Sequence, residues 1–156
     1  MTANVALVLH VLLGFAAIAF LVVPGLFLEL AAGTHDVPFM RKAYSLMSFH
    51  GRIGGPLAIL ILPVGIWAAI AYGIPLNTHW LMVSYVAYAV LITIGLGYHM
   101  RREIKIGALA AASPDAAPSP ELAETIDDRM ARPMMIISVL LWIFLIWLMI
   151  AHPVLF

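Results

Sequence analysis

Four long apolar runs alternate with short polar segments along the 156-residue chain. The runs cover residues Val5–Leu30, Ile53–Tyr72, Trp80–Gly97 and Met134–Ala151. Apolar runs of about 18 or more residues are typical of helices that cross a membrane. The pattern therefore predicts an all-α fold, an integral membrane four-helix bundle.

The polar segments between these runs are too short to form a second domain. Residues 112–120, rich in alanine, proline and serine, predict a low-complexity linker. Residues 39–49 and 121–132 predict polar or amphipathic helical extensions of the second and fourth spans. We expect a bend at Pro24 and Gly25 in the first helix. The whole chain, residues 1–156, is thus expected to be a single four-span transmembrane domain.

The charges are segregated although the formal net charge is zero. All eight lysines and arginines flank the first and third connections: Arg41, Lys42, Arg52, Arg101, Arg102, Lys105, Arg129 and Arg132. The positive-inside rule therefore predicts two basic cytoplasmic connections and both termini outside. We expect a multi-pass protein of the cytoplasmic (inner) membrane, with the lipid bilayer as its main partner and no nucleic acid bound.

The cysteine and histidine content limits the chemistry that the protein can perform. The chain has no cysteine, which excludes disulfides, thiolate-held iron–sulfur clusters and cysteine nucleophiles. It has six histidines, and three of them share one arrangement with a glycine. The pairs are His10 with Gly14, His50 with Gly54, and His99 with Gly95.

Residues four apart lie on the same face of a helix, one turn from each other. In each pair the glycine lies on the midplane side of the histidine. A haem needs this geometry, because an imidazole binds its iron and no side chain stands beneath the ring. We therefore expect His10, His50 and His99 to be candidate ligands of haem iron, with Gly14, Gly54 and Gly95 beside them.

His50 and His99 are expected at similar depths on consecutive antiparallel helices. Two histidines on two helices are a common way for a membrane bundle to hold haem b. Arg52 and Arg101 could then pair with the haem propionates. His10 would bind an outer haem, or the only one.

Structural alternatives remain open for the same residues. A neutral histidine can hydrogen-bond a neighbouring helix, and small residues in membrane helices often serve close helix packing. Glu29, near the inner end of the first span, is an acid whose burial would be costly and which therefore suggests function.

Several local motifs carry a family resemblance. They are Val-Leu-His10-Val-Leu-Leu-Gly14-Phe, a third helix that opens at Trp80 and ends Gly-Tyr98-His99, and a fourth that ends Ala-His152-Pro153. This pattern resembles the HemJ-type protoporphyrinogen oxidases and the CopD-like group of small four-span membrane proteins. The resemblance implies haem b at His10. The essential lysine of those oxidases has no counterpart, since Ser84 stands at its position by spacing.

Three functions follow as hypotheses. The first is a haem-b-binding membrane protein in electron transfer, with quinone as a candidate partner. The second is a HemJ-like protoporphyrinogen oxidase. The third is a non-catalytic accessory subunit, in which the small-residue faces pack against other membrane subunits or further copies of the chain.

Overall fold

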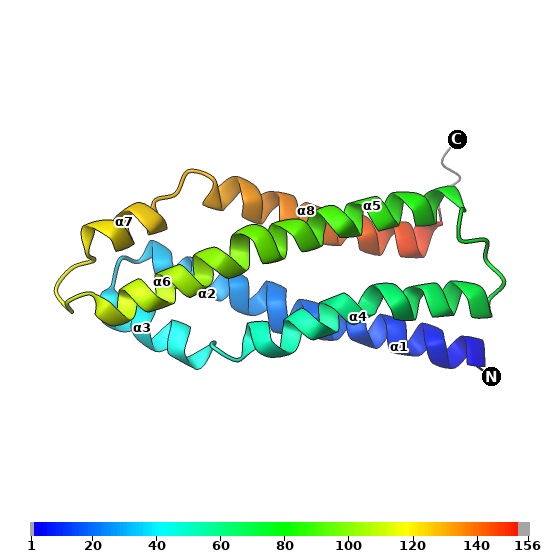
Figure 1. Ribbon diagram of the computed structural model, residues 1–156, viewed down its shortest axis with the longest axis horizontal. Coiled ribbons are helices and arrows are strands. Elements are labelled where there is room, and N and C mark those ends of the chain that lie inside the picture. Colours follow the sequence, from blue (N-terminus) through cyan, green and yellow to red (C-terminus); the bar gives the residue numbers. More distant parts are fainter. Residues whose placement is uncertain (1, 153–156) are drawn as a thin grey trace.

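The computed structural model describes residues 2–152, and these form helices joined by short connections (Figure 1). The elements, in order, are α1 (Thr2–Ala17), η1 (Ile18–Val22), α2 (Val23–Gly33), α3 (Val37–Leu46), α4 (His50–Ala71), α5 (His79–Ile94), η2 (Gly95–His99), α6 (Met100–Ala112), α7 (Pro120–Ile126) and α8 (Ala131–Ala151). The segments η1 and η2 are π-helical turns within longer helices.

Four helical stretches are long and apolar enough to cross a membrane: Thr2–Gly33, His50–Ala71, His79–Ala112 and Pro120–Ala151. The prediction of an integral membrane helical bundle is therefore confirmed. The third stretch extends well beyond its apolar run, because the polar segment after Gly97 continues the same helix to Ala112.

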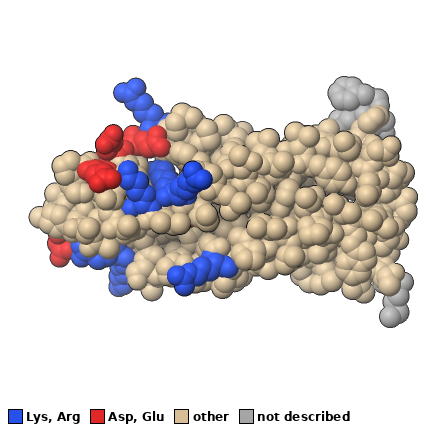
Figure 2. Space-filling view, in the orientation of Figure 1, with Lys and Arg blue, Asp and Glu red and all other residues tan. Residues whose placement is uncertain are grey.

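The bundle consists of two helix pairs that run along its length (Figure 1). The first span, α1 to α2, packs mainly on α4, and α5 packs mainly on α8. The start of α1 and the end of α8 lie at the same end of the molecule (Figure 1). We call this end, where the described residues include no lysine, arginine, aspartate or glutamate, the neutral end. The lysines, arginines, aspartates and glutamates gather at the opposite end, which we call the basic end (Figure 2).

The basic end carries its own small core. Side chains of α2, α3, α6 and α7 are buried against one another there, and we call this assembly the basic-end cap. Its core residues are Leu28, Ala31, Ala32, Val37, Met40, Ala43, Tyr44, Ile106, Ala110, Leu122 and Ile126. Burial raises the pKa of the Tyr44 hydroxyl, which donates to the Leu28 carbonyl at 3.4 Å and stays neutral.

Side-chain caps set the helix starts in this cap. Asp36 accepts a hydrogen bond from the Phe39 amide at the start of α3, and Ser119 accepts one from the Leu122 amide at the start of α7. Arg41 donates to the Ala110 and Ser113 carbonyls, which joins α3 to the end of α6. The connection at 113–119 is thereby held against the cap, whereas the sequence indicated only a low-complexity linker.

Two expected continuous helices are interrupted. The extension over residues 39–49 does not run into the second span, because α3 ends at Leu46 and a turn precedes α4 at His50. The extension over 121–132 is broken between α7 and α8, where Asp128 accepts from the Met130 amide. In both places a polar approach segment folds back into the cap and buries its apolar face there.

A π-helical turn, Ile18–Val22, lies just before Pro24, where a bend was expected. The Val23 amide donates to the Ile18 carbonyl, five residues back. Proline has no amide hydrogen and clashes with the preceding turn, so a wider turn relieves the strain. Here α4 comes very close, since a Cβ added at Gly54 would lie 3.0 Å from the Phe20 carbonyl oxygen.

Candidate functional site

Among the described residues, a half-open cavity lies toward each end of the bundle. The neutral-end cavity, about 450 Å³, is lined by residues of α1, α4, α5 and α8, among them His10, Gly14 and Tyr85. The basic-end cavity, about 160 Å³, is lined by residues that include His50, Gly95, His99 and Arg102. Each cavity therefore receives predicted site residues. Trp142 of α8 lines both, and so it forms part of the wall between them.

His10 is held in a defined orientation at the neutral-end cavity. Its Nδ1 lies 3.1 Å from the Ile61 carbonyl oxygen of α4. A carbonyl can only accept, so Nδ1 carries the hydrogen and donates it. A neutral imidazole then has its lone pair at Nε2, for which the described residues provide no hydrogen-bond partner. Metal-binding histidines are commonly oriented in this way by a backbone carbonyl.

The glycine beneath the His10 ring is Gly65 of α4. A Cβ at Gly65 would lie 2.7 Å from the His10 Cε1 atom, so any larger residue would push the imidazole aside. A Cβ at Gly14, by contrast, would meet nothing within 4 Å. Gly14 thus leaves the cavity wall bare, while Gly65 packs against the ring. The sequence pattern missed Gly65 because it lies on another helix.

Aromatic side chains form much of the remaining wall of the neutral-end cavity. They include Trp80, Tyr85 and Tyr88. The Tyr85 hydroxyl is buried and has no hydrogen-bond partner among residues 2–152. Trp80 stacks on His152, with ring centroids 4.6 Å apart, and both rings line the cavity.

Ser84 also lines this cavity. It is buried, and its hydroxyl donates to the Trp80 carbonyl at 2.7 Å. The position that matches the lysine of the HemJ-type oxidases therefore faces the same space as His10. A hydroxyl engaged with its own helix has neither the charge nor the basicity of that amine.

His50 lies at the basic-end cavity and is engaged through both ring nitrogens. Its Nδ1–H donates to the Met47 carbonyl in the turn before α4, and its Nε2 lies 3.0 Å from Glu103 Oε2. Since Nδ1 already carries a hydrogen, the second contact requires one further proton, held on Nε2 or on the carboxyl group. His50 and Glu103 therefore share a proton at the cavity wall.

His99 faces α8 from the other side of the same cavity. Its Nε2 lies 3.0 Å from the Ser138 hydroxyl. It belongs to the π-helical turn η2, which begins at Gly95. Gly95 lines the cavity and has nothing within 4 Å of a Cβ position, so this wall is also bare. His50 and His99 thus line one cavity, and each contacts a side chain there.

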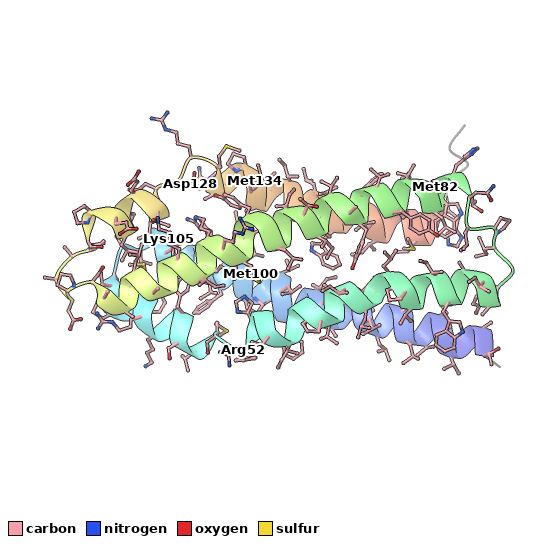
Figure 3. All side chains as sticks on the ribbon, in the orientation of Figure 1. Arg52, Met82, Met100, Lys105, Asp128 and Met134 are labelled. Carbon is pink, nitrogen blue, oxygen red and sulfur yellow. The ribbon has the colours of Figure 1, made fainter. Side chains whose placement is uncertain are left out.

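The arginine at this cavity is Arg102, which sequence reasoning did not choose. Arg102 is 8% exposed, donates from Nη1 to Glu29, and donates from Nη2 to the Ile126 carbonyl at 3.0 Å. Arg52 and Arg101 are exposed and belong to neither cavity wall. Figure 3 shows Arg52 at the start of α4, on the edge of the molecule. The helical phase explains the difference, because Arg102 lies 100° around the helix from Arg101.

Gly54 serves close helix packing in this structure. A Cβ there would lie 2.6 Å from the Leu21 side chain of η1, and Gly54 is buried outside both cavities. This is the alternative that the sequence left open. The glycine that opens the basic-end cavity on α4 is its neighbour Gly55, which has nothing within 4 Å of a Cβ position.

The other candidate ligands are scattered. Within the described part of the chain, no group of three or more His, Asp or Glu side chains is placed to hold a metal ion. The methionines Met82, Met100 and Met134 lie at separate points along the bundle (Figure 3). A haem differs from a free metal ion in this respect, because its ring nitrogens already provide four ligands and the protein adds only one or two.

These features define the class of protein: a multi-pass integral membrane helical bundle with a half-open cavity toward each end. The particular family follows from a family-model match over residues 4–153, described as "Predicted integral membrane protein (DUF2269)". The chain therefore belongs to this family. No curated protein and no solved structure matches the chain. The resemblance to the HemJ-type and CopD-like proteins is supported at the level of a membrane protein family and no further.

Proposed function

We propose that this protein is a haem-b-binding protein of the cytoplasmic membrane that transfers electrons, with quinone as its exchange partner. The haem is proposed to lie in the neutral-end cavity, with His10 as an axial ligand. The single observation that carries this choice is the His10 geometry. Its Nδ1–H is held by the Ile61 carbonyl, and its Nε2 lone pair remains available beside a cavity of about 450 Å³.

The dimensions and lining of this cavity support the proposal. Its volume lies in the range of roughly 300–1,000 Å³ that proteins use for small molecules and cofactors. Gly14 and the aromatic walls suit a flat apolar ring. The lining has no lysine or arginine. The charged propionates of a haem would therefore depend on the aqueous edge of the cavity, where Tyr72 and His152 lie.

The basic-end cavity is a weaker haem site. Its volume is about a third of that of the neutral-end cavity. His50 could ligate iron through Nε2 only if it lost its hydrogen bond with Glu103. We therefore propose one haem, on His10, in preference to a haem between His50 and His99. When bound, the haem supplies one-electron chemistry, and the chain tunes its potential through the axial ligand and burial.

The first experiment is a visible spectrum of the purified protein, oxidised and then reduced with dithionite. A Soret shift with α and β bands on reduction is expected. His10→Ala should remove these bands, whereas His35→Ala should leave them unchanged, since His35 lies in an exposed turn. A protein that stays colourless when haem is supplied during expression would refute the proposal. Bands that persist in His10→Ala and vanish in His99→Ala would move the haem to the basic end.

A second candidate function is the HemJ-like protoporphyrinogen oxidase. The observation in its favour is that His10 and Ser84 line the same cavity. Ser84 is the position that corresponds, by its spacing from Trp80, to the essential lysine of the HemJ-type oxidases. An assay of protoporphyrinogen oxidation by reconstituted protein with quinone tests it, and turnover above the spontaneous rate would favour it over simple electron transfer. Co-purification of stoichiometric membrane partners without any chromophore would instead favour the accessory-subunit hypothesis.

A further inference from the structure

We propose that the basic-end cavity binds the ring of a membrane quinone, whose carbonyl oxygens meet the Arg102 guanidinium and the proton shared by His50 and Glu103. This inference names the site of the exchange partner, and in that respect it rests on the proposed function. The binding site itself depends only on residues of the basic-end cavity.

The shape of the cavity suits one flat ring that enters from lipid. Gly51, Gly55 and Gly95 line it, and a Cβ at any of the three would meet nothing within 4 Å. Much of the remaining lining is aliphatic. At about 160 Å³ the cavity holds a single ring more readily than a tetrapyrrole. A ligand for this space must be flat, uncharged and soluble in the membrane.

The polar groups at the cavity call for a hydrogen-bond acceptor. Arg102 is nine-tenths buried, and its Nε–H has no partner among the described residues. An unsatisfied buried donor costs about 1–3 kcal/mol, and native proteins leave few of them. Both Nη groups are already occupied, by Glu29 and by the Ile126 carbonyl. A carbonyl oxygen of a bound ring would satisfy the Nε donor without adding charge, once the Arg102 side chain turns this atom, which is closed off in the structure, toward the ring.

The shared proton of His50 and Glu103 matches the chemistry of a quinone. Reduction of a quinone to a hydroquinone takes two electrons and two protons, one proton on each carbonyl oxygen. The two electrons would be passed one at a time from a haem bound at His10, which a one-electron donor outside this chain must re-reduce after each transfer. The His50–Glu103 pair can give its shared proton to one carbonyl oxygen of the quinone. The Glu103 side chain is 23% exposed, so the pair can take up a second proton from water at the basic end and pass it to the other carbonyl oxygen. His99, Glu29 and Arg102 face the same space and set the charge around this transfer.

The wall between the cavities adds support for this arrangement. Trp142 lines both, so a ring in the basic-end cavity and a ligand at His10 would lie on two sides of one helix segment. The electron acceptor and its proton source would then be at the basic end, and the electron carrier at the neutral end.

The test is a titration of the full-length protein in detergent with decylubiquinone, followed by calorimetry. Saturable binding is expected, and Gly95→Leu should weaken it at least tenfold because the new side chain fills the cavity. Gly97→Leu is the matched control. Gly97 lies in the same turn but is exposed and outside both cavities, so this variant should bind like the unsubstituted protein. Absence of saturable binding, or equal binding by the two variants, would overturn the proposal.

Two further arms separate the sources of such a ligand and the role of the arginine. Displacement of decylubiquinone by equimolar phosphatidylglycerol would show a lipid site and overturn the proposal. The infrared carbonyl stretch of ¹³C-labelled quinone should shift to lower frequency on binding, and Arg102→Lys should reverse part of this shift. If the Arg102→Lys variant still binds the quinone and the carbonyl frequency of the bound quinone is the same as in the unsubstituted protein, Arg102 does not contact the quinone. If Arg102→Lys fails to fold, the comparison of Gly95→Leu with Gly97→Leu still decides.

The same titration on His10→Ala separates this inference from the proposed function. Binding that persists in a haem-free His10→Ala protein and is lost in Gly95→Leu supports the quinone site by itself. A protein that holds haem but binds no quinone would overturn only this inference. A protein without haem whose quinone binding depends on Gly95 would refute the haem and leave the quinone site standing.

Discussion

The two cavities differ in what holds their histidines, although the histidine–glycine spacing along the chain is the same in both. At the neutral end a backbone carbonyl holds His10, and the cavity is wide and apolar. At the basic end a side chain also engages the Nε2 atom of each histidine, Glu103 for His50 and Ser138 for His99, and the cavity is narrow and bordered by ionisable groups. A histidine held by a carbonyl alone keeps a free lone pair, whereas one that is also paired with a carboxylate shares a proton. The first is suited to binding a metal and the second to moving protons.

The two ends of the bundle also differ in how many side chains they bury. The basic-end cap has a compact core and a partly buried ion pair, and the membrane spans toward the neutral end bury few side chains within the chain. Lipid accounts for this difference, because it solvates the apolar faces that water would drive into a core. We therefore expect mutations at the basic end to change folding stability and mutations at the neutral end to change ligand binding.

The largest expected effect comes from breaking the ion pair of the basic end. Glu29→Ala leaves the guanidinium of Arg102 buried without its carboxylate. Removing one partner of a buried pair typically costs about 3–5 kcal/mol. The Glu29 side chain is 30% exposed, so we expect a loss near the lower end of that range in unfolding by SDS in mixed micelles. Glu121→Ala is the control, since its pair with Lys105 is exposed and should contribute less than about 1 kcal/mol. Equal losses for the two variants would show that the basic end does not depend on this pair.

An intermediate effect is expected at the seat of His10. Gly65→Ala forces a Cβ against the imidazole, and overpacking of this kind costs about 1–3 kcal/mol. The ring must move from the Ile61 carbonyl, so any haem bands should shift or weaken as well. Gly14→Ala is the matched control from the opposite wall, where a methyl group has open space. If Gly14→Ala disturbs the spectrum more than Gly65→Ala does, the proposed seat of the imidazole is wrong.

The contrast between these two glycines shows how far sequence could reach. The apolar runs predicted the four spans because hydropathy is a local property of the chain. The histidines and two of the three paired glycines lie at cavities because helical spacing places them on one face. The role of Gly65 was not predicted, because it depends on contact with the His10 ring on another helix. The residues around Gly65 and around His10 in the sequence do not indicate that contact.

The basic-end network was missed for the same physical reason. Glu103 meets His50 across 53 residues, and Arg102 meets Glu29 across 73. The burial cost of an acid did point to Glu29, but its partner could not be chosen between adjacent arginines without the helical phase. The structure places Arg102 at the cavity and leaves Arg101 and Arg52 exposed, and this difference depends on the helical phase.

The smallest expected effect is at His99, and it sharpens the difference between the two histidines of the basic end. Ser138→Ala removes the hydroxyl that meets His99 Nε2, and a neutral hydrogen bond of this kind contributes about 0.5–1.5 kcal/mol. Thr93→Ala is the control, because the Thr93 hydroxyl bonds only to the Ala89 carbonyl of its own helix. The histidine ¹⁵N signals of His99 should change in Ser138→Ala while those of His50, held by Glu103, stay in place. A change in both sets would mean that the two histidines are coupled through the cavity, and the basic end would then have to be treated as one proton network extending from Glu103 to Ser138.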